Sequence, residues 1–165
     1  MDDAEAAAFL TALAAPGQPG PAFAALEALV RREVGATLFT VMFYDAATTM
    51  ARRAYTSHPK DYPVAGEKPL SVGAWSSVVI AQRRPFVANS IGAIADVFPD
   101  HPLIKSLGCE SVVNWPVQFD GEVIGTINAL DVADHYTPER VAKFSALAPF
   151  CALAIMAARL ASGKA

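Results

Sequence analysis

The sequence is poor in cysteine. Only two of its 165 residues are cysteines, Cys109 and Cys151, and they lie far apart with no spacing typical of a metal site. This pattern excludes a fold held together by several disulfides. A chain of this length can build one hydrophobic core without such cross-links. We therefore expect a single-domain, reduced, cytoplasmic protein.

Charged residues are also few. They make up 18% of the chain, with a net charge of -3 and an isoelectric point of about 5.5. Arginine pairs at 31–32 and 83–84 form no basic patch, so we expect no nucleic-acid partner and no anionic membrane surface as partner. The acidic opening segment MDDAE lacks the basic start of a signal peptide. The longest apolar run, residues 144–158, is too short to cross a bilayer and predicts a buried helix.

The motifs of several enzyme classes are missing. The sequence has no phosphate-binding glycine loop, no HExxH motif and no Ser-His-Asp arrangement. Its three histidines, His58, His101 and His135, are expected in loops, and none has a partner at metal-ligand spacing. We expect these histidines to have surface or turn roles, and we expect neither a metal nor a cofactor.

Apolar residues are abundant instead, at 53% of the chain. A helix is predicted over residues 2–15, with acids at its start, and the segment PGQPGP ends it. A second amphipathic helix is predicted over 22–35, where Gly35 ends it. The last helix is predicted to begin at Thr137 as N-cap and to kink at Pro149.

Between these helices the pattern predicts strands. β-branched and aromatic residues favour strands over 37–45 and 50–57, and a loop follows over 58–69. Residues 73–83 are compatible with a helix, 84–90 with a short strand, and 91–108 with two short helical turns. Strands 111–119 and 122–130 flank Asp120-Gly121, which favours a type I′ hairpin turn. We therefore predict an α+β fold with an antiparallel sheet, terminal helices on one face, and an irregular helical segment over the other face.

The predicted hairpin carries two asparagines where a buried sheet normally has aliphatic residues. Alternation places Asn114 on one face with Val112 and Pro116, and Ser111, Val113 and Trp115 on the other. On the partner strand, Asn128 shares a face with Ile124, Thr126 and Leu130. A buried amide without partners costs about 1–3 kcal/mol, so each needs backbone groups, water or a ligand as partner. We expect the two amides to face a common small-molecule pocket; hydrogen bonds to neighbouring loop backbone are the alternative.

Several of these segments together resemble a GAF domain, the sensor fold related to PAS. The resemblance rests on LFTVMFYD, on RRPFVANSIG, on SLGCESVVNWPVQFDGEVIGTINALD and on the final YTPERVAKFSALAPFCALAI. It implies a helix and linker over residues 1–20 and one GAF domain over 21–161. The segment YTSHPKDYPVAGEKP is similar to that of small stand-alone bacterial members.

The resemblance also implies where a ligand would bind. In GAF domains the helical middle often closes over the ligand, which makes Asp96 a candidate; a helix cap or solvated charge is the alternative. Aromatic walls with a few polar groups are usual for such pockets, although core packing is also possible for each ring. The candidate wall residues are Tyr44, Tyr55, Trp75, Phe98 and Trp115.

Cys109 supports an alternative, enzymatic hypothesis. One GAF branch reduces free methionine sulfoxide with cysteines around its pocket. This sequence departs from that branch, because Val112 stands where the branch has an acid and Cys151 belongs to the last helix. The bilin-binding branch needs a Cys-His pair, whereas Cys109 is followed by Glu110. A buried, inert thiol is the simpler interpretation.

Three functions therefore stay open. The first is a non-catalytic sensory or regulatory GAF domain that binds a small molecule and acts through a protein partner. The second is the methionine sulfoxide reductase, and the third is a ligand-free dimerisation module. Because residues 144–160 are apolar around most of the helix, we expect a homodimer through the terminal helices; coverage by the first helix of the same chain is the alternative.

Overall fold

A computed structural model describes residues 2–45, 48–64, 67–70 and 72–163 of the chain. The helices are α1 (Asp3–Ala14), α2 (Gly20–Glu33), α3 (Ala74–Ser76), a π-helical turn (Ser77–Ala81), α4 (Ile91–Ala95), α5 (His101–Ser106), α6 (Pro138–Ala142) and α7 (Phe144–Ala161). The strands are β1 (Leu38–Asp45), β2 (Met50–Thr56), β3 (Lys68–Pro69), β4 (Phe86–Ala88), β5 (Ser111–Phe119) and β6 (Glu122–Asp131).

The strands form one antiparallel sheet in the order β3-β2-β1-β6-β5-β4. The tight turn between β5 and β6 has the predicted conformation, since Asp120 and Gly121 have φ angles of 49° and 76°. The register of this hairpin places Asn114 directly opposite Asn128. β6 is paired with β1 on one side and with β5 on the other along most of its length, so the amides lie in the middle of the sheet.

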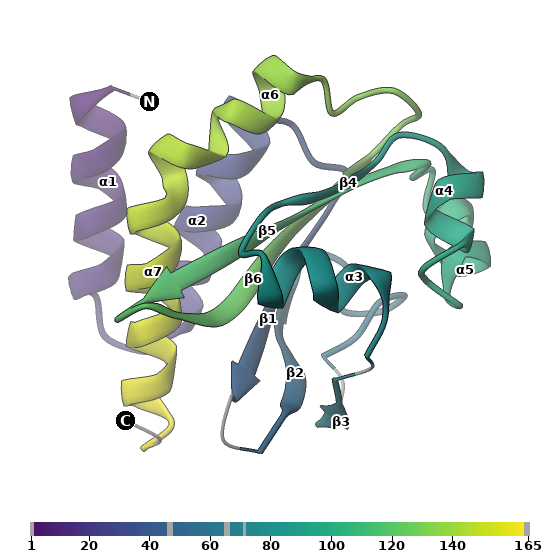
Figure 1. Cartoon of the computed structure of the whole chain (residues 1–165). Helices are drawn as coiled ribbons and strands as arrows, with labels where there is room; N and C mark the ends of the chain where they lie inside the picture. The colour runs from purple at the N-terminus through teal and green to yellow at the C-terminus, as the bar shows by residue number, and fades with distance from the viewer. Residues whose placement is uncertain (1, 46–47, 65–66, 71, 164–165) are drawn as a thin grey trace.

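Helices lie on both sides of the sheet (Figure 1). The long helices α1, α2 and α7 form a layer on one side, and the short helices α3, α4 and α5 lie on the other. The predicted α+β class and the placement of terminal and middle helices are confirmed. Phe9 of α1 meets Phe150 of α7 edge to face, with ring centroids 5.1 Å apart.

The main core fills the space between the sheet and the long helices. It contains Phe23 and Leu26 of α2, Phe39 of β1 and Ile155 of α7, all essentially inaccessible to solvent. β1 and β6 approach closely at Gly125, where a Cβ atom would collide with the Met42 carbonyl oxygen. Glycine is therefore required there by space. A smaller cluster around Ile94, Ile104 and Val112 anchors α4 and α5 to the opposite face.

The last helix differs from the prediction of one continuous element. Thr137 caps α6 as expected, with its side chain accepting from the Arg140 amide, but the chain turns at Lys143 before α7 begins. Pro149 lies inside α7. The prediction of a buried helix holds for one face only, because a third of the window 144–161 is buried. By length and composition α7 could cross a membrane, but its inner face packs on α2 and the sheet.

Two other segments depart from expectation. Residues 73–83 form only the short helix α3 and a π-helical turn rather than a regular helix. The expected loop over 58–69 ends in β3, two residues long, which pairs with β2. This pairing matters for the site because it carries the end of the loop along the edge of the sheet.

Candidate functional site

The two central asparagines are joined in a chain of side-chain hydrogen bonds. The Trp75 indole N–H donates to Asn114 Oδ1 at 2.9 Å, and Asn114 Nδ2 donates to Asn128 Oδ1 at 2.7 Å. Asn128 Nδ2 then donates to Thr40 Oγ1 at 3.0 Å. Both amides are buried, with 5% and 7% of their surface exposed. Their partners are side chains rather than the loop backbone considered from the sequence.

The amides face a cavity of about 380 Å³ on the side of the short helices. Its floor is the sheet, and residues 97–100 and 104, from the helical middle, lie over it with Trp75 of α3. A carboxamide nitrogen carries two hydrogens, and each asparagine uses one in the chain of bonds. Each amide nitrogen therefore keeps a second hydrogen beyond the bonds of this chain.

Three of the five candidate aromatic residues line this cavity, namely Tyr44, Trp75 and Phe98. Tyr44 and Trp75 pack edge to face with ring centroids 5.9 Å apart. The Tyr44 hydroxyl lies 3.2 Å from Thr126 Oγ1. Burial raises the pKa of Tyr44 well above its ordinary value, so the hydroxyl stays protonated and neutral.

Tyr55 and Trp115 were wrongly placed in the pocket wall, and both lie on the long-helix side. Trp115 stacks on Phe144 at 5.5 Å, as the alternation of β5 requires. Tyr55 packs on Phe23 at 5.3 Å. Its orientation follows from a bulge in β2, where Tyr55 pairs with Val41 but Arg53 pairs with the next residue of β1.

A second bulge corrects the assignment of Ile124. The register of the hairpin shifts after Val117, so Gly125 pairs with Val117 and Val123 pairs with Gln118. Ile124 therefore joins the long-helix core instead of the face that carries Asn128. Alternation alone cannot reveal either bulge.

Asp96 was also a wrong choice, because it is exposed at the end of α4 and does not line the cavity. The helical middle instead contributes Asp100, four residues further along the chain. The Tyr62 hydroxyl donates to Asp100 Oδ2 at 2.5 Å. Burial, followed by the neighbouring Asp100 carboxylate, raises the pKa of Tyr62.

Arg53 is another cavity residue that sequence reasoning missed. Its guanidinium lies over the Tyr62 ring, 3.9 Å from the ring centroid, and Nη1 donates to the Pro63 carbonyl at 2.6 Å. Arg53 and Tyr62 come from β2 and from the loop after it, so the proline-rich loop forms one wall. The sequence signal for this wall was weak: an arginine just before, and a tyrosine within, the proline-rich segment 58–69.

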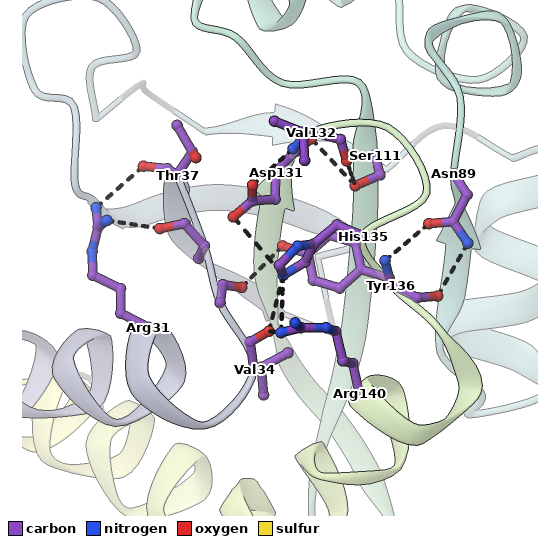
Figure 2. A network of polar contacts seen from close by, with 12 residues as sticks. Arg31, Val34, Thr37, Asn89, Ser111, Asp131, Val132, His135, Tyr136 and Arg140 are labelled. Carbon is purple, nitrogen blue, oxygen red and sulfur yellow. Dashed lines mark hydrogen bonds and ion pairs between the residues drawn. The ribbon is translucent and has the colours of Figure 1, made fainter.

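Two of the histidines follow the expectation of turn roles, although His101 begins α5 rather than lying in a loop. His58 and His101 each bond locally, to Ser57 Oγ and to the Phe98 carbonyl. His135 belongs to a polar network that ties the β6–α6 loop to the end of α2 (Figure 2). Its Nε2 lies 3.0 Å from the Val34 carbonyl, which also accepts from Arg140 Nη1 at 2.8 Å. Within the described residues no group of three or more His, Cys, Asp or Glu side chains could hold a metal ion.

Comparison with known families decides what kind of domain this is. The family model of the GAF domain matches residues 24–156. The chain belongs to the GAF domain family. No curated protein matches it.

Solved structures have the same GAF fold at low sequence identity. One is the GAF domain of a two-component sensor histidine kinase from Bacillus halodurans, with 14% identity, a TM-score of 0.69, and 90% of this chain and 99% of that chain covered. Another is a methyl-accepting chemotaxis protein, with 16% identity, a TM-score of 0.64, and coverage of 94% and 97%. A third is a type II free methionine-R-sulfoxide reductase from Thermoplasma acidophilum, with 16% identity, a TM-score of 0.63, and coverage of 94% and 96%.

The cysteines of this GAF domain are both buried and free. Cys109 lies in the cluster under α4 and α5 and is not among the residues that line the cavity. Burial, with a smaller contribution from Asp131, raises the pKa of the Cys109 thiol to about 11. Cys151 lies in the long-helix core, where burial raises its pKa as well. A thiolate is disfavoured at both positions at neutral pH, whereas redox-active cysteines require one.

Proposed function

We propose that this GAF domain is a non-catalytic sensory module that binds a small molecule in the cavity lined by Asn114 and Asn128. The observation that carries the proposal is the cross-strand amide pair on the floor of a cavity of about 380 Å³. This volume lies within the range of about 300–1,000 Å³ that is common for small-molecule sites.

The make-up of the walls supports binding. Rings of Tyr44, Trp75 and Phe98 offer apolar contact, and the amides offer donors that fix orientation. The sensor kinase and the chemotaxis protein with the same fold support a role in signalling. The buried Cys109, with its raised pKa, speaks against the reductase alternative.

Binding would act on the residues over the cavity. Trp75 and Asn114 both line the cavity, and Trp75 donates to Asn114 Oδ1, so a ligand that bonds to this oxygen competes with the Trp75 indole. A ligand can shift α3 and the helical middle only by binding one arrangement better than another. The resulting change would reach a protein partner through the sheet and the long helices.

A metabolite screen tests the proposal. Native mass spectrometry of protein purified from its own cell extract would detect a retained ligand, and a thermal-shift screen would find others. A ligand at 100 times its dissociation constant stabilises the folded state by about 2.7 kcal/mol. The variant Ala51→Phe places a ring in the cavity and should abolish that shift, whereas Ala148→Phe, on α7, should keep it. Retained binding in a folded Ala51→Phe protein would place the site elsewhere.

We propose further that the domain is a homodimer through the terminal helices. The outer face of α7 exposes Leu153 and Leu160, at 42% and 63%, and α1 exposes Leu10 at 51%. Apolar side chains at this spacing suit helix–helix packing between two copies.

Light scattering after gel filtration measures the oligomeric state. Leu153→Glu should convert the dimer to a monomer, because it buries a charge in the interface. The matched control is Leu103→Glu on α5, which is similarly exposed at 38% and should leave the dimer intact. A monomeric wild-type protein would contradict the proposal.

A further inference from the structure

Arg53 has an unused hydrogen-bond donor inside the cavity wall. Its Nε is buried and has no hydrogen-bond partner in the described part of the chain. Nη1 is already engaged by the Pro63 carbonyl, and the ring of Tyr62 covers one face of the guanidinium. Buried donors are nearly always paired, so an unpaired guanidinium N–H beside a cavity indicates a missing acceptor.

In the described part of the chain, the charge of Arg53 is also without a close partner. Among the described residues no carboxylate lies within ion-pair distance of its guanidinium. Asp100 lines the same cavity, but its Oδ2 accepts from the Tyr62 hydroxyl, so Tyr62 stands between the two charges. Arginine is always protonated in proteins and matches the geometry of carboxylate oxygens.

We infer that the cavity takes a small organic monocarboxylate, with its carboxylate on the Arg53 guanidinium and an apolar body against the aromatic walls. This inference rests on the proposed function and specifies its ligand class. The described residues that line the cavity contain one cation, Arg53, and one anion, Asp100, which suits a ligand with a single negative charge. Phosphate esters carry more negative charge and meet the Asp100 carboxylate, so the site disfavours them.

The rest of the lining fits a body of modest size. Phe98, Trp75 and Leu70 are apolar surfaces around the cavity, while the Asn114 and Asn128 amides lie on its floor. An aryl or branched alkyl carboxylate satisfies both parts. A neutral amide of the same shape keeps the apolar contacts but loses the ionic hydrogen bond to Arg53.

Matched pairs of compounds provide the test. The probes are benzoate and benzamide, phenylacetate and phenylacetamide, indole-3-acetate and its amide, isovalerate and isovaleramide, with phenyl phosphate as the phosphate arm. Calorimetry and thermal shift on the full chain should show at least tenfold tighter binding of the acid than of its amide, which is about 1.4 kcal/mol. Phenyl phosphate should bind more weakly than the carboxylates.

Variants of the two neighbouring arginines locate the effect. Arg53→Met should reduce the preference for acids over amides at least tenfold. Arg53→Lys, which keeps a charge but lacks the planar guanidinium, should restore the preference only in part. The matched control is Arg52→Met, because Arg52 lies over Phe43 on the other side of β2 and does not line this cavity. Its preference should equal that of the wild type.

The outcomes distinguish the carboxylate inference from the more general proposal of a ligand-binding domain. Equal binding of acids and amides, or an unchanged preference in Arg53→Met, overturns the carboxylate assignment and leaves a ligand-binding domain. Tighter binding of phenyl phosphate overturns it in the same way. Absence of any stabilising compound, in this panel and in the metabolite screen, removes both proposals. The comparison of acid with amide needs no variant, so it holds even where Arg53→Met fails to fold.

Discussion

Replacing the central amides one at a time and then together tests how they are held. Asn114→Leu removes the acceptor of Trp75 and leaves Asn128 Oδ1 buried without its donor. Asn128→Leu removes the acceptor of Asn114 Nδ2 and the donor to Thr40 Oγ1. A buried polar group that loses its partner costs about 1–3 kcal/mol, so each single variant should lose about that much stability.

The double variant should lose much less than the sum. It removes both amides and leaves two groups without their partners, the Thr40 hydroxyl and the Trp75 indole. Because Trp75 is only half-buried, the loss of its acceptor should cost little. Replacing both partners of a hydrogen bond by apolar groups of similar shape is close to neutral. We therefore expect a coupling of about 1–3 kcal/mol in favour of the double variant.

Urea unfolding followed by circular dichroism gives the four free energies of unfolding. A control cycle pairs Asn114→Leu with Asn89→Leu, since Asn89 bonds to Tyr136 and shares no partner with Asn114. That cycle should be additive within about 0.5 kcal/mol. Additive losses in the Asn114–Asn128 cycle would refute the chain of hydrogen bonds. The double variant should also lose ligand binding, which would show that the amides are kept for the site rather than for stability.

Three further predictions concern other parts of the domain. Gly125→Ala should cost about 2 kcal/mol or more in urea unfolding, because its Cβ meets backbone, whereas Gly92→Ala meets nothing closer than 3.9 Å and should be near neutral. The Cys109 thiol should react slowly with Ellman's reagent at pH 8, and fast labelling of the folded protein would contradict its burial. The free energy of unfolding should fall as the pH rises from 9 toward the folded pKa of about 11, because the thiol of the unfolded chain ionises first. Ligand should change the fluorescence of Trp75 in a Trp115→Phe protein, and an unchanged Trp75 signal on binding would place the ligand away from α3.

The sequence allowed the main features of the sheet to be predicted because its local signals agree with one another. The Asp120-Gly121 turn pairs Phe119 with Glu122, a register that alone would set Asn114 opposite Ile127. The bulge after Val117 shifts the register by one residue, and only then does Asn114 lie opposite Asn128. Local signals therefore predict the turn and the two strands of the hairpin, whereas the amide pair depends on the bulge. The strands of the central hairpin and the long terminal helices needed no knowledge of long-range contacts, whereas β3 was missed and the helix predicted over 73–83 is only the short α3 and a π-helical turn.

The missed residues depend on features with no local signal. A bulge in β2 turns Tyr55 to the long helices and leaves Arg53 on the cavity side, and nothing in residues 50–57 marks that extra residue. The position of Tyr62 depends on how the proline-rich loop folds back along the sheet. Long-range contacts of Tyr62 with Asp100 and Arg53 fix that position. Asp96 and Asp100 have the same charge and nearby positions, and only the packing of α4 and α5 selects between them.

The arrangement of the sheet indicates how a signal could cross it. Neighbouring residues of β5 point to opposite sides, so Asn114 contacts Trp75 on the cavity side while Trp115 stacks on Phe144 of α7 on the other. A ligand that moves Asn114 therefore acts on the same strand that supports the exposed, apolar helix α7. Coupling between the two sides requires that α7 have two arrangements that the ligand distinguishes. In a Trp75→Phe protein, a change in Trp115 fluorescence on binding would reveal that coupling, and a silent Trp115 would confine the effect of the ligand to the cavity side.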